Sequence, residues 1–293
     1  MHATRSARLV LAVAAGVLLS LGLASCHADP APTAASSTGT AAATPTASAE
    51  PYRAPSTKTV AALPEARYDA VIGGLLPSYD PDVPKAAGHA YTIQRDAPLY
   101  GADRTEPVAR LAAENFLGDP TVVVPLRFQG DWALVMTPSR QALPSAAPDG
   151  APAQTAGWMR RDLLHQGDAL DDHIVISVGD QTVSIVAASG KVVHEFPAGV
   201  GAGDTPTPTG VVGYIQARYL DPAQDQTVHQ INLTTLHSAA ADEPFGGDDG
   251  GLIGVHYESV ARGAVSHGCV RLDGDAVDAI NALPLGTIVQ MVA

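Results

Sequence analysis

The chain has 293 residues, of which 46% are apolar, 5% aromatic and 16% charged, and its formal net charge is −13. This length and apolar content suffice for one large folded domain or two modest ones. Residues 172–293 hold fourteen Asp and Glu residues but only four basic ones, so the chain lacks the basic face that nucleic-acid binding requires.

The first 26 residues have the pattern of a secretion signal. Arg5 and Arg8 precede an apolar run over residues 9–23. This run is shorter than the roughly 20 apolar residues that a membrane-spanning helix needs. The run leads into Leu-Ala-Ser before Cys26, an ending that resembles a bacterial lipobox. We expect Cys26 to be lipidated and to anchor the exported chain to the outer face of the cytoplasmic membrane, facing the cell wall. Ordinary signal cleavage is the alternative.

Residues 27–62 consist largely of Ala, Thr, Ser and Pro, with almost no bulky apolar side chain. Such a composition cannot bury enough surface to fold, so it predicts a disordered tether.

Residues 63–168 are expected to form a small β domain behind a preamble that carries no recognisable element. Gln129-Gly130-Asp131 predicts a hairpin turn. The expected strands are 90–94, 121–128, 132–137 and 157–161. Trp132, Ser139-Arg140 and Gly157-Trp158 resemble the small bacterial barrels of the Src-homology-3 (SH3) type. Trp132 and Trp158 are interpreted as core or rim residues, with ligand contact as the alternative.

Residues 169–293 are expected to form a second β-rich domain. A helix is predicted over 275–283, because Asp275 lies near its dipole-favoured start and Pro284 follows its end. Alternating or buried apolar patterns predict strands at 173–179, 181–187, 191–200, 211–220, 227–234, 252–256 and 287–292.

The chemistry centres on Cys269, which is the only cysteine besides Cys26. An unpaired thiol in an exported protein is a liability unless it is used. The thiol lies within Ser266-His267-Gly268-Cys269-Val270-Arg271, thirteen residues after His256. Imidazoles and cations favour the reactive thiolate, and Gly268 lets backbone N–H groups face a developing oxyanion. The pattern predicts a cysteine acyl-transfer centre.

Four features, in this order, resemble the catalytic domain of the bacterial L,D-transpeptidases, the YkuD-like family. They are the Pro/Thr-rich turn 203–210, the strand 252–256 that ends in His256, the segment 266–272, and a closing helix and strand. Many members follow the first histidine with glycine and a longer loop, where this chain has Tyr257. The expected fold class is therefore mainly β: an SH3-like barrel followed by a β-sandwich with few short helices.

The resemblance implies a role for each residue of the centre. Cys269 is the nucleophile, and His256 is its base or ion-pair partner. The backbone carbonyl of Tyr257 orients the His256 ring. Gly268 and Cys269 offer the N–H groups of the oxyanion hole.

The roles of three flanking residues stay open. His267 either binds substrate or holds the loop. Arg271 either receives a carboxylate of the substrate or, as slightly favoured, braces the loop through an acidic residue such as Asp273. Ser266 is placed on the substrate side and is expected to form a hydrogen bond within the turn.

We expect no metal and no cofactor. His256, His267 and Cys269 lack the second cysteine pair of a zinc site, and zinc would silence the thiol. Asp248-Asp249 lacks the spaced oxygen ligands of a calcium loop. His229 and His237 receive no role.

The resemblance implies that the partners are peptidoglycan stem peptides. Cys269 attacks the amide before the terminal D-alanine of a tetrapeptide stem, and an amine of a neighbouring stem resolves the thioester as a 3→3 cross-link. Water as acceptor would make an L,D-carboxypeptidase, and a protein amine would attach a protein to the wall. A non-catalytic wall-binding lipoprotein is the alternative from another class.

Overall fold

The computed structural model describes residues 52–246 and 249–293. The signal segment with Cys26 and most of the expected tether lie outside these residues. Residues 53–293 form one compact unit. The end of the expected tether is ordered, because Ser56 caps helix α1 (Thr57–Ala61) and the side chain of Val60 is buried. No helix in the described ranges has the length and apolar character needed to cross a membrane.

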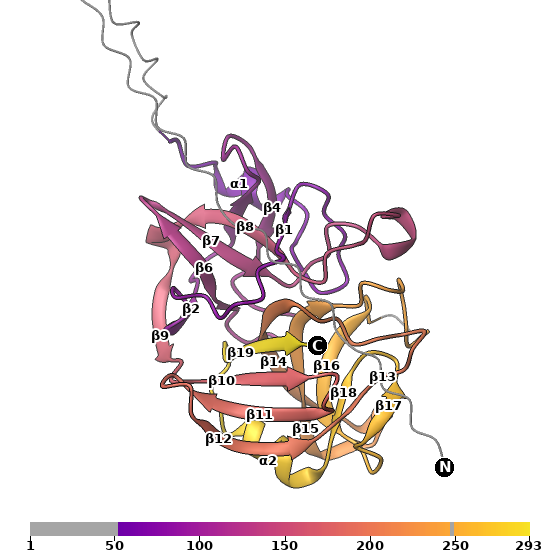
Figure 1. Cartoon of the computed structure of the whole chain (residues 1–293). Helices are drawn as coiled ribbons and strands as arrows, with labels where there is room; N and C mark the ends of the chain where they lie inside the picture. The colour runs from indigo at the N-terminus through magenta and orange to yellow at the C-terminus, as the bar shows by residue number, and fades with distance from the viewer. Residues whose placement is uncertain (1–51, 247–248) are drawn as a thin grey trace, which may run out of the picture. The chain divides into compact units, whose positions relative to one another are not determined.

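The described part of the chain is mainly β, as expected (Figure 1). The N-terminal half carries a six-stranded antiparallel sheet with the path β4-β3-β8-β7-β6, and β1 pairs with β8. Gly130 has φ 57° in the hairpin between β6 and β7, which confirms the predicted turn. The strands are β1 (Leu76–Pro77), β3 (Ala97–Tyr100), β4 (Pro107–Leu111), β6 (Pro125–Gln129), β7 (Trp132–Thr137) and β8 (Thr155–Arg160).

A separate three-stranded sheet has the order β5-β2-β9. Its strands are β5 (Val122–Val123), β2 (His89–Thr92) and β9 (His165–Ala169).

Trp158 is 3% exposed, and the guanidinium carbon of Arg104 lies 3.6 Å from its ring centroid. The ring of Trp132 lies 5.1 Å from that of Tyr100. Packing is therefore the observed role of both tryptophans.

The C-terminal half is built on a ten-stranded sheet with the order β12-β11-β10-β19-β14-β15-β16-β18-β13-β17. The predicted strand 191–200 is in fact two strands, β12 and β13, which belong to different parts of this sheet. The strands are β10 (Asp172–Ser177), β11 (Thr182–Ala187), β12 (Val192–Pro197), β13 (Gly199–Gly201), β14 (Val211–Asp221), β15 (Gln226–His237), β16 (Leu252–Tyr257), β17 (Gly263–Ser266), β18 (Val270–Leu272) and β19 (Ile288–Val292). Single turns of 3₁₀-helix in the described ranges are Pro144–Ala146 and Arg161–Leu163 in the N-terminal half and Pro222–Gln224 in the C-terminal half.

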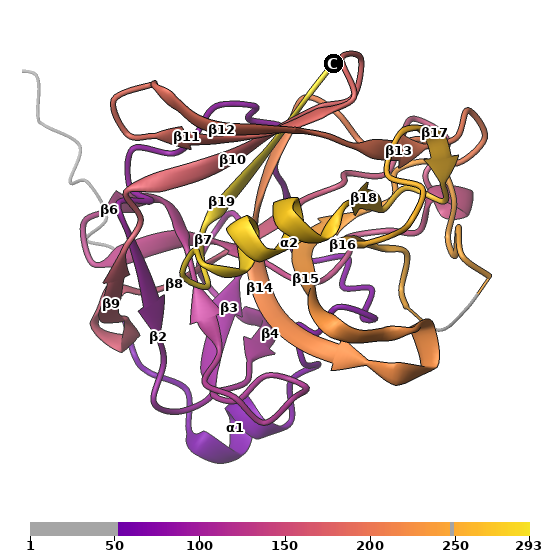
Figure 2. The same cartoon turned by 90° about the horizontal axis from the view of Figure 1, so that it is seen from below.

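The predicted helix is α2 (Gly274–Asn281), which packs against β15 and β16 (Figure 2). The Asp273 carboxylate caps its start by accepting a hydrogen bond from the Ala276 N–H at 3.0 Å. At the other end Arg218 donates to the carbonyls of Leu283 and Ile280, at 2.6 and 3.1 Å. A cation at this position also complements the helix dipole.

Strands β16 and β18 run parallel, with His256 opposite Arg271. Successive side chains of a strand point to opposite faces. One face, with Val255 and Val270, is buried in the main core beneath α2. The other face carries His256 and Arg271, with Cys269 just before β18, and this alternation places the three polar groups on one side of the sheet.

The two halves are joined by buried polar contacts. Arg140, 2% exposed, donates to the carbonyls of Asp242, Ser238 and Ala241, at 2.7, 3.2 and 3.2 Å. His237 Nε2 donates to the Tyr68 carbonyl at 2.8 Å. A shared apolar cluster contains Val124 and Met136 from one half and Val212 and Tyr214 from the other. The two halves therefore pack against each other as one body and are not connected by a flexible linker alone.

Candidate active site

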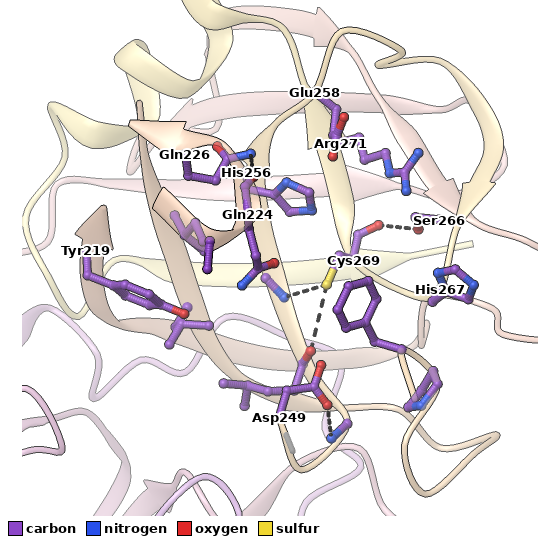
Figure 3. Close-up of a pocket in the computed structure, with 18 of the residues that line it drawn as sticks. Tyr219, Gln224, Gln226, Asp249, His256, Glu258, Ser266, His267, Cys269 and Arg271 are labelled. Carbon is purple, nitrogen blue, oxygen red and sulfur yellow. Dashed lines mark hydrogen bonds between the residues drawn. The ribbon is translucent and has the colours of Figure 1, made fainter. Parts of the chain in front are cut away.

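The predicted catalytic and substrate-binding side chains meet at one cavity of about 580 Å³ (Figure 3). Its lining includes His256, Ser266, His267, Cys269 and Arg271. The sequence order of the motif and the register of β16 and β18 together produce this arrangement.

The Cys269 sulfur lies against strand β16. Its Sγ accepts a hydrogen bond from the Gly254 N–H at 3.3 Å and donates to the Leu252 carbonyl at 3.8 Å. A Cβ at position 254 would lie 3.7 Å from the sulfur, an ordinary van der Waals contact. The cysteine is only partly buried as a residue and lines the cavity, so substrate can reach it.

The resting thiol is protonated. Burial raises the pKa of Cys269, and the charge of Asp249 adds to this, against the lowering effects of the Gly254 N–H and Arg271. Arg271 lowers the pKa of the thiol, as expected of a neighbouring cation, but desolvation outweighs this effect. The thiol needs a base at the moment of attack.

His256 is suited to be that base. Its Nδ1 lies 3.0 Å from the Tyr257 carbonyl, which can only accept, so Nδ1 carries the proton and Nε2 keeps its lone pair. Burial lowers the pKa of His256, so the ring is neutral near pH 7. The ring and the thiol line the same cavity, although within residues 52–246 and 249–293 no hydrogen bond joins them directly.

The Tyr257 carbonyl has a second donor that the sequence did not reveal. Gln226 Nε2 lies 2.9 Å from this oxygen, and the Gln226 side chain is buried. The amide thus fixes the group that orients His256. A glutamine that begins a strand carries no sequence signal for this role.

The turn before the nucleophile is held by Ser266. Its hydroxyl donates to the Cys269 carbonyl at 2.5 Å and accepts from the Gly268 N–H at 3.2 Å. The expected turn hydrogen bond is present, and Ser266 is 2% exposed. Gly268 has φ +117°, a conformation that requires glycine. The structure differs from expectation at the Gly268 N–H, because this group donates to Ser266. Among the residues that the structure describes, no hydrogen bond engages the Cys269 N–H, the other group proposed for the oxyanion.

The Pro/Thr-rich turn supports the nucleophile segment from behind. Buried Thr207 donates to the Gly268 carbonyl at 2.7 Å and accepts from the Gly201 N–H at 2.9 Å. The Ser266 carbonyl accepts from the Ala202 N–H at 2.8 Å. The turn therefore has a structural role at the site.

Arg271 faces the cavity beside His256, and its Nε is buried without a hydrogen-bond partner in the described ranges. The bracing contact with Asp273 is not formed, because that carboxylate caps α2 instead. His267 is exposed, with its ring 6.0 Å from that of Phe245.

The two histidines left without a role have structural contacts. His229 pairs with Asp278 at 2.8 Å, and buried His237 joins the two halves. Within the described ranges, no three His, Cys, Asp or Glu side chains are arranged to hold a metal.

The cavity has further walls that the motif does not predict. Tyr68 and Phe116 come from the N-terminal half, and Tyr219 comes from β14. These residues are distant from the motif along the chain, so only the packing of the two halves brings them to it.

Comparison with known proteins supports the resemblance over the second half of the chain. Residues 171–291 match the family model of the YkuD L,D-transpeptidase catalytic domain. No curated protein matches the chain.

Solved structures that match this chain include three bacterial L,D-transpeptidases. The enzyme from Stackebrandtia nassauensis is 16% identical with a TM-score of 0.31, over 42% of this chain and 56% of that one. L,D-transpeptidase 1 of Mycobacterium tuberculosis is 16% identical with a TM-score of 0.31, over 47% and 78%. The Mycobacterium smegmatis enzyme is 16% identical with a TM-score of 0.35, over 59% and 91%.

This chain thus spans little more than half of the Stackebrandtia chain. The family model begins at residue 171, and the likeness of residues 63–168 to an SH3-type barrel stays an expectation. Residues 171–291, with His256 and Cys269 among them, are the part of the chain that is similar to the YkuD L,D-transpeptidase catalytic domain.

Proposed function

We propose that this protein is a peptidoglycan L,D-transpeptidase that works through a cysteine thioester. The observation that carries the proposal is the state of His256. Its proton is fixed on Nδ1 by the Tyr257 carbonyl, and its other nitrogen is left as a base in the cavity that holds the Cys269 thiol. Nucleophile, base and orienting group form the triad arrangement of acyl-transfer enzymes.

In the first half-reaction, His256 Nε2 takes the thiol proton as Sγ attacks the carbonyl carbon before the terminal D-alanine of a tetrapeptide stem. The Cys269 N–H stabilises the oxyanion of the tetrahedral intermediate. The carbon–nitrogen bond then breaks, and the imidazolium gives its proton to the departing D-alanine amine. Arg271, whose Nε has no hydrogen-bond partner in the described ranges, offers a cation to a stem carboxylate.

In the second half-reaction, a side-chain amine of a neighbouring stem attacks the thioester. His256 accepts the proton that the amine loses, the carbon–sulfur bond breaks, and the thiol regains its proton. The product is a 3→3 cross-link, and the net reaction exchanges one amide for another. Anchoring through Cys26, which lies outside the described residues, would hold the enzyme at the outer face of the cytoplasmic membrane, next to this substrate.

The acceptor distinguishes the remaining candidates. Water at the second step would make the protein an L,D-carboxypeptidase, and a protein amine would make it an attachment enzyme. A wall-binding lipoprotein without catalysis would need no base beside its thiol.

The test is to incubate the purified chain with disaccharide-tetrapeptides and identify the products by mass spectrometry. A cross-linked dimer with one D-alanine released per link supports transpeptidation. A trimmed tripeptide alone supports the carboxypeptidase, and a protein–muropeptide adduct supports attachment. Turnover by Cys269→Ala that equals wild type would contradict all three.

A further inference from the structure

One wall of the catalytic cavity is aromatic and is supplied largely by the N-terminal half. The rings of Tyr68 and Phe116 lie 4.9 Å apart at 64°, and those of Phe116 and Tyr219 lie 6.3 Å apart at 89°. All three residues line the cavity that holds Cys269, and all three are partly exposed. We call these residues the aromatic wall.

The aromatic wall is held in place. The Tyr68 carbonyl accepts the hydrogen bond from buried His237, so the backbone of the wall is tied to β15. Gly250 approaches the same segment so closely that a Cβ there would lie 2.8 Å from the Tyr68 carbonyl. Buried Arg140 ties the N-terminal half to the segment that precedes β16. A ligand therefore meets a preformed surface and need not order it.

Apart from Arg67, whose guanidinium carbon lies 5.7 Å from the Tyr68 ring centroid and which pairs with Asp69, the polar groups near the aromatic wall are neutral or acidic. Gln224 and Asp225 line the cavity beside Tyr219, and the Tyr219 hydroxyl points into it (Figure 3). Among the described residues that line the cavity, Arg271 is the one arginine, and it belongs to the catalytic motif. This chemistry disfavours an anion at the aromatic wall.

Partly exposed rings beside hydroxyl, amide and carboxylate groups suit a ligand with an apolar face and a hydroxylated edge. A pyranose ring has this form: its C–H face packs on an aromatic ring, and its hydroxyls donate and accept hydrogen bonds. An aromatic wall within a polar cavity is thus more suited to a sugar than to an extended peptide, whose backbone seeks strand partners.

We propose that the aromatic wall is the subsite for the sugar that carries the stem peptide. The inference rests on the proposed function and makes the N-terminal half part of the substrate site. Three extended residues span about 10 Å, so a sugar on the aromatic wall leaves the stem free to reach the thiol within one cavity. The enzyme should then prefer glycan-linked stems to free peptides.

Kinetics with two donors test the proposal in the full chain. For Phe116→Ala we expect KM for a disaccharide-tetrapeptide to rise about tenfold while KM for the free tetrapeptide stays unchanged, the loss corresponding to about 1.4 kcal/mol. Phe116→Tyr keeps the ring and should retain the preference. Phe128→Ala is the matched control, because Phe128 belongs to the same half but packs against Tyr91 at 6.2 Å, outside the cavity lining. An equal effect of Phe116→Ala on both donors, or no effect on either, overturns the proposal.

Direct binding separates this inference from the proposed function. Calorimetry with the peptide-free disaccharide and the Cys269→Ala chain needs no turnover. Binding that Phe116→Ala and Phe116→Leu both weaken supports the subsite even if no D-alanine is ever released. Absence of binding, or binding unchanged in both variants while they melt like wild type, overturns it.

Discussion

The carbonyl oxygen of Tyr257 lies 3.0 Å from Nδ1 of His256 and so determines which nitrogen of the imidazole is free. The carbonyl belongs to the end of β16, and Gln226 at the start of β15 donates to it from the other side. The base of the proposed reaction is therefore held by backbone and by one buried amide, rather than by a third charged residue.

Gln226 should act as a positioning residue. Gln226→Leu removes the hydrogen bonds to the Tyr257 carbonyl at 2.9 Å and to the Gln224 carbonyl at 3.4 Å. The loss of the shorter bond, worth about 1 kcal/mol, should lower kcat about fivefold with little change in KM. Gln226→Glu should behave differently with pH, because only its protonated carboxyl can donate to the Tyr257 carbonyl. The ratio of its kcat to that of wild type should rise as pH falls from 8 to 5.

Gln216→Glu is the matched control for this measurement. Gln216 is also buried and donates to a backbone carbonyl of the same sheet, that of Thr234 at 2.7 Å, but it lies outside the cavity lining. The ratio of the Gln216→Glu kcat to the wild-type kcat should not change with pH. The same flat ratio for Gln226→Glu would contradict a role of the amide in orienting His256.

The reactivity of the free thiol should reflect its burial. The pKa of Cys269 is raised above the usual cysteine value of about 8.5. The rate of iodoacetamide labelling should therefore continue to increase with pH above 8.5. A chain with Cys26→Ser makes Cys269 the only thiol. A labelling rate that levels off near pH 7 would show a preformed thiolate and contradict the protonated resting state.

Turnover should keep its base at mildly acidic pH. The pKa of His256 is lowered below its usual 6.5 by burial, so the neutral ring persists as pH falls through 6.5. The acidic limb of kcat/KM should therefore have its midpoint below pH 6.5. A midpoint above 6.5 would contradict this assignment.

Buried Thr207 should stabilise the nucleophile segment through its two hydrogen bonds. Thr207→Val leaves the Gly268 carbonyl and the Gly201 N–H without their partner, which should lower the free energy of unfolding by about 1–3 kcal/mol. The rate of acylation should fall as well, since the segment loses its support. Thr209→Val, at an exposed position of the same turn, should change neither quantity; urea unfolding and D-alanine release measure both. Equal effects of the two variants would contradict the bracing role.

His237 should make the protein sensitive to acid. Burial lowers its pKa to about 4 from the usual 6.5, so between these pH values His237 is protonated in the unfolded state and neutral in the folded state. The stability that depends on neutral His237 is fully present above pH 6.5 and is lost as pH falls through 4. The free energy of unfolding changes by about 3 kcal/mol over this range. Urea unfolding at pH 7.5 and pH 4.5 should show a smaller pH dependence for His237→Gln than for wild type. An unchanged dependence would mean that His237 does not titrate in this way.

The local pattern predicted the β-rich C-terminal half well. The short apolar segment 252–256 predicted β16, and Asp275 with Pro284 predicted α2 to within two residues. A short motif that carries nucleophile, glycine and histidine reveals its chemistry because those groups must lie next to one another in the chain.

Contacts between distant segments were not predictable. Gln226, Tyr68 and Phe116 reach the site only through sheet register and the packing of the two halves. The split between β12 and β13 depends on a change of strand partners that a single apolar run does not encode. The protonated thiol was missed because burial, which sets its pKa, follows from the fold rather than from the motif.

The most direct test of the account is the mass of the intact chain after brief mixing with a disaccharide-tetrapeptide. The account predicts that the wild-type chain gains the mass of the stem substrate less one D-alanine, bound at Cys269, and releases D-alanine in equal amount. Cys269→Ala should show neither change. D-alanine released by Cys269→Ala at the wild-type rate, or no adduct and no release by the wild-type chain, would contradict the thioester mechanism.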